Sequence, residues 1–558
     1  MRPFLAPAVL ALSLALAGCA ATSARPSRQA AAVAPAPTAP PKLVVAIAID
    51  QFSADSFAQF RQRYTGGLAR LQQGAVFPSA FQSHAATETC PGHSTLLTGA
   101  RPSRTGIIAN MWFAPEIARA DKRIYCAEDE SDPASTSREP VVSAVHLKVP
   151  TLGERMKAAN PASRNVAVSA KDRAVMMMGG HQIDEGYWWK NGAFVTLAGR
   201  PLAPAAVAEN AAIASRLKAG EPGYALPAWC TGFDHAVQAG PVSIGTGRFA
   251  MEPNKPDQFR VSPRMDAATV DLAVRLVDAL QLGKQQAPDL LSVSLSANDY
   301  IGHAVGSEGA EMCIQMAALD RLLGEFLGKL DARGLDYIVV LSADHGGLDT
   351  PERLAQQALP RATRADAALL PAALAKAVTA KTGIATTGPL LFADGPFGDY
   401  YVARSLPSAD RARVVAALVP LLRAHPQVAA AFTADELASA PLPVGSPQDW
   451  TLKERARASF DPQRSGDVVV LLDRAVVPIP SPAPGYTATH GSAWDYDRRV
   501  PLLFWRKGLP ALEQPAPVET VDIAPTLAAV LGLGVPEGAF DGRCLDIDGS
   551  AANSCARK

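Results

Sequence analysis

Residues 290–303 read LLSVSLSANDYIGH, an apolar strand pattern at 290–295 that runs into a polar turn. An amphipathic helix pattern follows, and its apolar positions include Cys313, Met316, Leu323, Phe326 and Leu330. A second apolar run at 337–341 then leads into the stretch Asp344-His345-Gly346-Gly347. This strand–helix–strand order predicts a βαβ unit, and therefore an α/β fold with a mostly parallel sheet and polar side chains at the strand ends.

The run LVVAIAI at 43–49 is apolar throughout, which is typical of a parallel strand covered on both faces. It ends in Asp50. Ligands of open α/β sheets bind beyond the carboxyl ends of the strands, so Asp50 is a candidate site residue, although a strand-end aspartate that caps a turn looks the same. Further strand patterns lie at 165–170, 467–472 and 500–505, and helix patterns lie at 269–282 and 523–531.

The stretch TETCPGHSTLLTG, residues 87–99, follows a β-like segment and a short loop, and it indicates the entry to a helix. Pro91 suits the first helical turn, where a backbone N–H has no partner within the helix. A hydroxyl at this position points into the partial positive charge of the helix N-terminus, which attracts anions. Thr89 is therefore a candidate nucleophile for an anionic substrate; an ordinary threonine N-cap is the alternative.

Two cations, Lys171 and Arg173, flank Asp172 directly after the strand pattern at 165–170. Both side chains could reach one phosphate group from this position. A solvated loop would show the same pattern.

Carboxylates and imidazoles follow several of the predicted strands. The candidate metal ligands are Asp50, Asp299, His303, Asp344, His345 and His490. Oxygen and nitrogen ligands of this kind fit zinc, and the spacing of Asp299 and His303 lets both reach one ion if the turn is helical. A single histidine is more often structural, but the set as a whole predicts a two-metal site, which suits in-line phosphoryl displacement by a hydroxyl.

Composition narrows the class of protein. Of the 558 residues, 48% are hydrophobic and 19% are charged, so the chain is globular rather than disordered. Its formal net charge is zero, and we therefore expect no nucleic-acid partner. We expect one catalytic domain over 42–558 with insertions near 174–265 and 350–460, of which the stretch 180–260 shows no sustained apolar period and predicts loops.

The N-terminus predicts export. Arg2 precedes the apolar run 4–16, which is too short for an ordinary membrane span, and residues 1–19 therefore indicate a secretory signal. Leu16-Ala17-Gly18-Cys19 resembles a bacterial lipobox, so Cys19 is a candidate lipid attachment site; a plain signal peptide is the alternative. The Ala/Pro-rich residues 20–41 predict a tether. We expect a periplasmic or extracellular protein, anchored to the outer membrane if Cys19 is lipidated.

Six cysteines remain after Cys19, an even number that predicts disulfides in an exported chain. Cys544 and Cys555 are close in sequence and are expected to pair. A bond from Cys90 to Cys126 would brace the turn that carries Thr89. The sequence leaves the remaining pairing open.

These motifs together resemble the alkaline phosphatase superfamily, and within it the phosphate-irrepressible type with a threonine nucleophile, over essentially all of residues 42–545. The matching stretches are AIDQF at 48–52, ATETCPGHSTLLTGARPSRTGIIAN at 86–110, SAKDR at 169–173, NDYIGH at 298–303, SADHGG at 342–347, THGS at 489–492 and VDIAPTLAAVLG at 521–532. The resemblance implies a three-layer sandwich with a central, mostly parallel sheet and loop-rich insertions.

The resemblance also implies roles for the residues. Thr89 would be the nucleophile and form a phosphothreonine, while Asn110, Lys171 and Arg173 would bind the phosphoryl oxygens. One zinc ion would be held by Asp50, Thr89, Asp344 and His345, and the other by Asp299, His303 and His490. The implied substrates are small phosphate monoesters hydrolysed by a monomer, and an additional Ca²⁺ or Mg²⁺ is left open.

The alternatives differ in identifiable residues. A phosphodiesterase or nucleotide pyrophosphatase on the same scaffold would share the zinc ligands and the threonine but lack the pair formed by Lys171 and Arg173. Such a pair favours monoesters, which carry one more ionisable oxygen than diesters. A sulfatase would need a Cys-x-Pro-x-Arg signature, which Cys90-Pro91-Gly92-His93 does not supply. A non-catalytic phosphate- or metal-binding module would not need both a nucleophile and two complete ligand sets.

Overall fold

The computed structural model describes residues 39–357, 359–548 and 553–556. The predicted signal segment 1–19, its candidate lipid site Cys19 and residues 20–38 of the predicted tether lie outside these ranges. Among the helices that are described, none combines the length and the apolar character that a membrane crossing requires.

Ten strands of the described chain form the main sheet, in the order β19-β2-β18-β11-β1-β10-β5-β6-β7, with β20 paired to β2. The strands are β1 (Leu43–Ile49), β2 (Ala75–Phe81), β5 (Asn165–Ser169), β6 (Glu185–Lys190), β7 (Ala193–Val195), β10 (Asp289–Leu295), β11 (Tyr337–Ser342), β18 (Arg499–Arg506), β19 (Leu512–Glu513) and β20 (Val518–Glu519). The central run β11-β1-β10-β5-β6 is parallel, whereas β18 runs antiparallel to β11 and β2. The sheet is therefore mostly parallel, as predicted.

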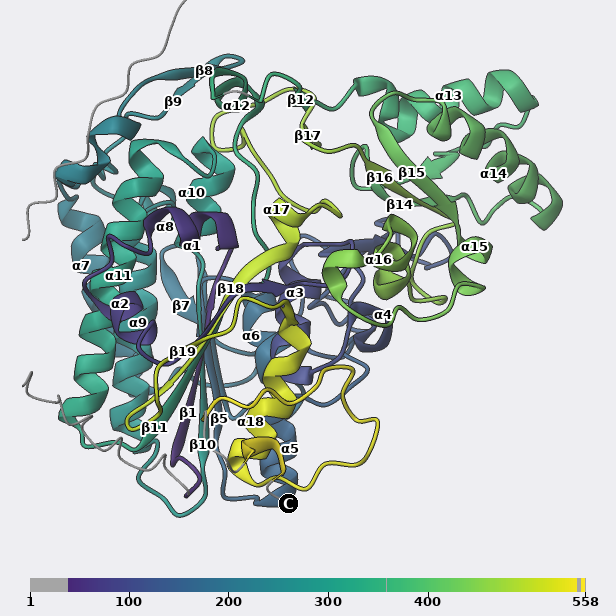
Figure 1. Cartoon of the computed structure of the whole chain (residues 1–558). Coiled ribbons are helices and arrows are strands. Elements are labelled where there is room, and N and C mark those ends of the chain that lie inside the picture. Colours follow the sequence, from purple (N-terminus) through teal and green to yellow (C-terminus); the bar gives the residue numbers. More distant parts are fainter. Residues whose placement is uncertain (1–38, 358, 549–552, 557–558) are drawn as a thin grey trace, which may run out of the picture. The chain divides into compact units, whose positions relative to one another are not determined.

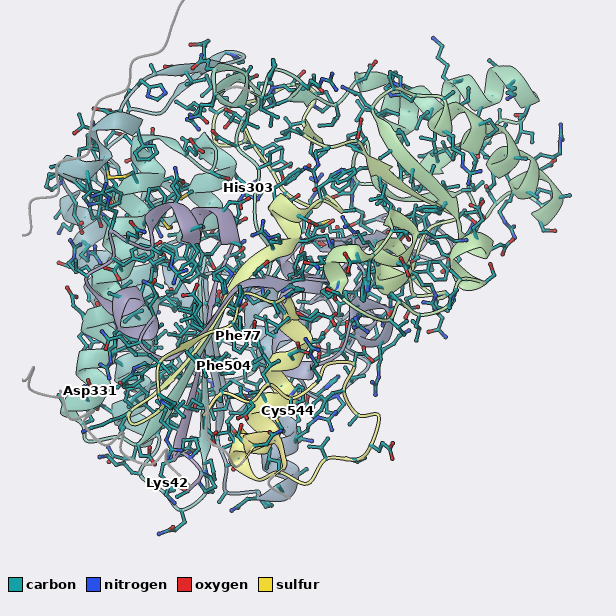
Figure 2. The ribbon with its side chains drawn as sticks, viewed as in Figure 1. Lys42, Phe77, His303, Asp331, Phe504 and Cys544 are labelled. Carbon is teal, nitrogen blue, oxygen red and sulfur yellow. A yellow bond between two sulfur atoms is a disulfide. The ribbon has the colours of Figure 1, made fainter. Side chains whose placement is uncertain are left out.

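The predicted strands at the centre of the sheet form at or within one residue of their expected bounds. Every residue of β1, β10 and β11 is buried, which explains why these runs are apolar without alternation. The edge toward β2 is less regular. The register between β2 and β18 shifts between Val500 and Leu502, close to Pro78 and Pro501. Across the same pair of strands, Phe77 packs edge-on against Phe504 (Figure 2).

Helices cover both faces of the main sheet (Figure 1). One layer contains α7 (Pro204–Ala219), α9 (Pro263–Leu280) and α11 (Gly309–Ala332), and the other contains α3 (Thr89–Thr98), α5 (Leu152–Ala159), α6 (Asp172–Gly179) and α18 (Ile523–Leu531). The main hydrophobic core lies between these layers and the sheet. The predicted three-layer α/β arrangement is confirmed.

Two helices show which local signals matter. Helix α18 has the predicted bounds and ends at Gly532, which adopts the left-handed conformation at φ 67°. Helix α9 begins six residues before the expected start at Thr269, because the Ser262 side chain accepts from the Arg264 amide and Pro263 occupies the first helical position.

The first of the two predicted insertions contains more regular structure than its sequence indicates. The stretch 180–260 supplies β6 and β7 to the main sheet and also forms α7, an Ala-rich helix without a marked apolar face. Residues 365–472 build a second, antiparallel sheet with its own core, in the order β13-β14-β16-β15. Its elements are α13 (Pro371–Thr382), β13 (Leu391–Phe392), β14 (Gly398–Val402), α14 (Ser408–Arg423), β15 (Val428–Thr433) and β16 (Val468–Leu472).

Three disulfides are formed in the described chain: Cys90–Cys126, Cys230–Cys313 and Cys544–Cys555. The first and third are the expected pairs. The second joins residues 83 positions apart, which is beyond what sequence proximity can indicate.

Candidate active site

Parallel pairing of three strands brings three aspartates to one edge of the main sheet. Ile49 of β1 lies opposite Leu295 of β10, and Ala48 lies opposite Ser342 of β11. The carboxyl ends of these strands are therefore level, and Asp50, Asp299 and Asp344 follow them within a few residues.

Asp50, Asp344 and His345 form one buried group of metal-ligand type, which we call triad 1. His345 Nε2 lies 3.3 Å from Asp344 Oδ2 and 3.5 Å from Asp50 Oδ1. All three side chains are fully buried.

Asp299, His303 and His490 form a second group, triad 2. Asp299 and His303 lie on α10 (Ala297–Val305), so their four-residue spacing brings both side chains to one face, as predicted. Nε2 of His303 and Nε2 of His490 each lie 3.4 Å from Asp299 Oδ1.

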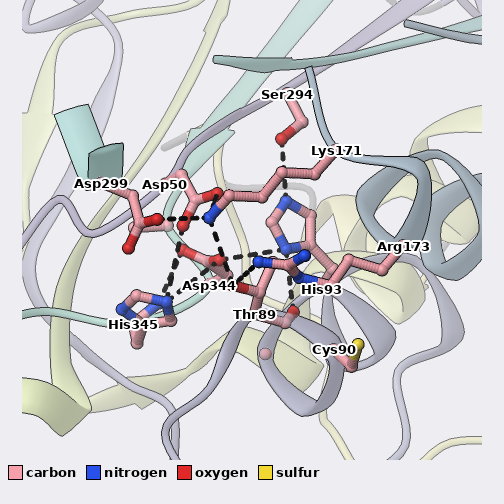
Figure 3. A network of polar contacts seen from close by, with 12 residues as sticks. Asp50, Thr89, Cys90, His93, Lys171, Arg173, Ser294, Asp299, Asp344 and His345 are labelled. Atoms are coloured by element: carbon pink, nitrogen blue, oxygen red, sulfur yellow. Dashed lines mark hydrogen bonds and ion pairs between the residues drawn. The ribbon is translucent and has the colours of Figure 1, made fainter. Parts of the chain in front are cut away.

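The two triads adjoin. The rings of His345 and His490 stack with their centroids 3.5 Å apart. Lys171 Nζ lies 2.5 Å from Asp50 Oδ2 and 2.5 Å from Asp299 Oδ2, so one ammonium group contacts a carboxylate of each triad (Figure 3).

The backbone orients the three imidazoles of the triads in the same way. Nδ1 of His345, His490 and His303 lies 2.8, 2.8 and 3.0 Å from the carbonyl oxygens of Gly346, Thr87 and Ala488 respectively. A carbonyl oxygen only accepts, so each Nδ1 carries a proton, and Nε2 keeps its lone pair wherever the ring is neutral. Burial opposes the charge on His490, but Asp299 outweighs it and raises the pKa of this ring. Burial lowers the pKa of His303 to about 4 and that of His345 to about 3, which keeps both rings in the neutral, ligating form.

Several buried atoms of the triads have no hydrogen-bond partner in the described chain. They are Asp50 Oδ1, Asp299 Oδ1, Asp344 Oδ2 and His345 Nε2. Leaving such groups unpaired is costly, and each of these atoms is a good ligand for a divalent cation. The donor set therefore fits one metal ion at each triad.

Thr89 is the first residue of α3, and Glu88 rather than Thr89 occupies the N-cap. The alternative of a simple threonine cap is therefore wrong. Lys171 Nζ and Arg173 Nη2 both donate toward Thr89 Oγ1 at 3.4 Å. The two cations that flank Asp172 thus reach the same hydroxyl, at the positive end of a helix.

Asn110 is held beside Thr89 by two hydrogen bonds. Its Oδ1 accepts from the backbone N–H of Cys90 at 2.8 Å, and its backbone N–H donates to Glu88 Oε2 at 2.7 Å. The Cys90–Cys126 disulfide ties the same turn to the neighbouring strand β4 (Arg123–Tyr125). Asn110 Nδ2 makes no hydrogen bond within the described residues, so it can donate to a bound ligand.

Charge within the site is distributed unevenly. Burial opposes the ionisation of Asp299, but Lys171, His303 and His490 outweigh it and hold the pKa of this carboxyl well below its usual range. Burial also opposes the charge on Lys171, yet Asp299 and Asp50 raise its pKa above the ordinary value. Burial and the neighbouring Asp344 carboxylate instead raise the pKa of Asp50 well above its usual range, although Lys171 opposes this. The site therefore keeps a buried ammonium beside the ionised carboxylate of Asp299.

The candidate nucleophile, phosphate-binding residues and metal ligands named from the sequence all lie in this one region of the structure. Sequence reasoning missed the residues that support them. His93, four residues after Thr89 on α3, has Nδ1 2.9 Å from the Thr89 carbonyl oxygen and 3.1 Å from Asp344 Oδ2. Tyr125 donates to Asp172 Oδ1 at 2.6 Å and accepts from Arg173 Nη1 at 3.5 Å. The spacing of Thr89 and His93 on one helix was a usable signal; the contact of Tyr125 is tertiary.

The fold and this arrangement define an α/β protein whose candidate two-metal centre lies beside a hydroxyl at a helix N-terminus. The model of the type I phosphodiesterase / nucleotide pyrophosphatase family matches residues 44–493. The chain belongs to this family, within the alkaline phosphatase superfamily.

Curated relatives and a solved structure agree with this assignment. The chain is 54% identical to alkaline phosphatase PhoK of a Sphingomonas species over 93% of each chain. It is 48% identical to alkaline phosphatase PhoD of Zymomonas mobilis over 93% of this chain and 90% of the relative. The crystal structure of alkaline phosphatase PafA superposes with a TM-score of 0.78 at 25% identity, covering 92% of this chain and 100% of that structure.

Proposed function

We propose that the chain is an exported, zinc-dependent alkaline phosphatase that hydrolyses small phosphate monoesters through a phosphothreonine intermediate. The observation that carries this proposal is the pair of cations, Lys171 and Arg173, each 3.4 Å from the Thr89 hydroxyl beside both triads. The names of the related alkaline phosphatases support the same activity.

In the proposed mechanism, Asn110 Nδ2, Lys171 and Arg173 bind the phosphoryl oxygens and turn the phosphorus toward Thr89 Oγ1. The Tyr125–Asp172 hydrogen bond holds Arg173 in place for this task. Zinc ions at the triads would supply Lewis acidity, lowering the pKa of the attacking hydroxyl and neutralising the leaving oxygen. Asp50, Asp344, His345 and Thr89 would hold one ion, and Asp299, His303 and His490 the other.

Thr89 Oγ1 releases its proton to solvent and bonds to phosphorus while the bond to the alcohol oxygen breaks, and the departing alkoxide takes a proton from solvent. Water cleaves the phosphothreonine in the second step, which releases orthophosphate and returns the proton to Thr89. Lys171 lies within reach of both triads and of Thr89. Its ammonium group can therefore stabilise negative charge on the carboxylates before the reaction and on the phosphoryl oxygens during it.

The deciding experiment compares kcat/KM for p-nitrophenyl phosphate and bis-p-nitrophenyl phosphate on one zinc-loaded preparation at alkaline pH, with an EDTA-treated sample alongside. We expect a large monoester preference that disappears on chelation. A diester preference would instead assign the chain to the phosphodiesterase branch with the same ligands. Absence of any chelator-sensitive activity would refute both.

Export and attachment rest on the sequence. We propose that residues 1–19 direct the chain out of the cytoplasm and that Cys19 carries a lipid. Mass spectrometry of the mature N-terminus tests both, since an acylated peptide beginning at Cys19 is expected and an unmodified N-terminus beyond it would exclude lipidation.

A further inference from the structure

A cavity of about 270 Å³ opens beside the candidate active site. His303 and His490 of triad 2 line it, together with Asn110 and Arg173. Among the described residues around it, none belongs to triad 1, and Thr89 does not line it either. The cavity therefore adjoins triad 2 and the phosphate-binding side chains, and Thr89 itself is not part of its lining.

Displacement at phosphorus places the attacking and leaving oxygens roughly in line, on opposite sides of the phosphoryl group. The helix that carries Thr89 contacts triad 1 through His93, whose Nδ1 lies 3.1 Å from Asp344 Oδ2. With Thr89 attacking from that side, the alcohol departs on the side of triad 2. The cavity occupies that side, so the organic part of a bound monoester points into it.

The cavity wall combines polar side chains with a group of aromatic ones. They are formed in part by Phe113, Phe397, Tyr401, Phe460 and Tyr486. Phe397, from the second sheet region, packs against the loop of His490: a Cβ at Gly491 would lie 3.0 Å from the Phe397 ring, and Gly491 has φ 108°. The glycine thus allows an aromatic wall directly beside a residue of triad 2.

The charged side chains of the wall have one dominant sign. Glu88, Asp394 and Asp399 line the cavity, whereas Arg173 is the only arginine and lysine does not occur among its described lining residues. Burial raises the pKa of Asp399 to about 7, so this carboxyl is ionised at alkaline pH. Arg173 also faces Thr89, where the phosphoryl group binds. Arg123, which is outside the lining, pairs with Asp394 at 3.5 Å, whereas no ion pair to Glu88 or Asp399 is found in the described chain. The part of the cavity beyond the phosphate position therefore keeps an excess of negative charge at alkaline pH, and it disfavours an anionic group.

We propose that this cavity is the leaving-group subsite, and that it selects phosphate monoesters whose organic group is apolar and carries no negative charge. The proposal rests on the phosphomonoesterase function proposed above. It identifies the second sheet region as the source of substrate preference, while the phosphoryl group is bound at the edge of the main sheet.

Binding to the subsite can be measured without catalysis. Phenylphosphonate and methylphosphonate share a phosphoryl-like group but have no ester bond to cleave. On the zinc-loaded enzyme we expect phenylphosphonate to inhibit with a Ki about tenfold lower, because its ring is removed from water in the cavity. Phe397→Ala should reduce this ratio severalfold, Phe397→Leu should give an intermediate ratio, and Leu442→Ala, at an exposed position outside the cavity lining, should leave it unchanged.

Charge selection is tested at alkaline pH with phenyl phosphate and 4-carboxyphenyl phosphate. We expect the double variant Asp394→Asn, Asp399→Asn to raise kcat/KM for the carboxylated substrate relative to phenyl phosphate by at least about threefold. The side-chain amide introduced by Asp399→Asn carries no negative charge, but its oxygen can still accept from the Gly466 amide, as Asp399 Oδ1 does at 2.6 Å. The matched control is Asp410→Asn, which removes a half-buried carboxylate of α14 that pairs with Arg413 outside the cavity lining and should leave the ratio unchanged.

The outcomes are distinguishable. If the wild-type enzyme hydrolyses phenyl phosphate but the Phe397 and aspartate variants leave both ratios unchanged, the subsite proposal is wrong and the phosphomonoesterase function stands. If the zinc-loaded wild type hydrolyses neither monoester, both proposals are overturned.

Discussion

The hydroxyl of Thr89, the first residue of α3, lies 3.4 Å from the ammonium nitrogen of Lys171. The same nitrogen contacts one carboxylate of each triad, so the candidate nucleophile, the candidate phosphate ligand and both candidate metal sites form one connected polar network. Each part of that network makes a separate prediction.

Replacing the nucleophile should abolish turnover without disturbing the fold. Thr89→Ala removes Oγ1, so we expect kcat for p-nitrophenyl phosphate to fall at least ~10³-fold, while Thr89→Ser, which keeps a hydroxyl, should retain much more activity. Steady-state kinetics on zinc-loaded protein check this, with metal content confirmed for each variant. A near-normal rate for Thr89→Ala would remove Thr89 from its proposed role.

The two cations should discriminate between ester classes. Replacing both Lys171 and Arg173 with alanine should lower kcat/KM for a monoester ~10³-fold and for a diester ~10-fold or less, because only the monoester carries the additional negative charge. The control is Lys190→Ala, a nearby cation whose side chain is half exposed and pairs with Glu139. An equal loss on both substrates would show that the pair serves general binding or folding instead.

Metal removal should destabilise the protein as well as inactivate it. Without divalent ions, Asp50, Asp299 and Asp344 are buried with unpaired carboxyl oxygens, and the Lys171 ammonium contacts only the first two. Ligands that bind only the folded state raise its stability by mass action. We expect EDTA to lower Tm by several degrees and zinc to restore it, with about two zinc ions per chain by elemental analysis and about one in His303→Ala. An unchanged Tm in a metal-free sample would count against this account.

A buried carboxyl away from the site should make stability depend on pH. Burial raises the pKa of Asp266 from 3.8 to about 6, although hydrogen bonds from Ala297 and Gln315 oppose this. Between these two pH values the folded chain keeps a proton that the unfolded chain releases. The contribution of Asp266 to the free energy of unfolding is therefore greatest below about pH 4 and is lost as the pH rises to about 6. At neutral pH the free energy of unfolding is lower by roughly 3 kcal/mol for this reason.

Asp266→Asn removes that titration. We expect its Tm to exceed that of the wild type by more at pH 8 than at pH 4, since only the aspartate must ionise at the higher pH. Asp271→Asn on the same helix, where the carboxylate is exposed and pairs with Lys329, is the matched control and should show no such difference. A constant Tm difference across this pH range would contradict the prediction.

The centre of the fold and the candidate site were predictable for one physical reason. A strand buried on both faces must be apolar throughout, so the runs before Asp50, Asp299 and Asp344 stand out, and the polar residues that follow them lie at one edge of the sheet. The second sheet was not predictable in this way, because β13 and β14 are short and β14 pairs with the distant strand β16, where Gly398 lies opposite Val470. The support that Tyr125 gives Arg173 likewise depends on tertiary contact.

The cavity beside triad 2 is formed by parts of the chain that can change independently in evolution. The proposed phosphoryl-binding residues and both triads come from the main sheet and its adjoining loops, whereas Phe397, Asp399 and Tyr401 come from the second sheet region. Inherited changes in that region can therefore alter which alcohol is tolerated while the chemical machinery stays intact. A chimaera that exchanges residues 365–472 between relatives would transplant preference as a module, and the acquired specificity would follow the donor of that segment.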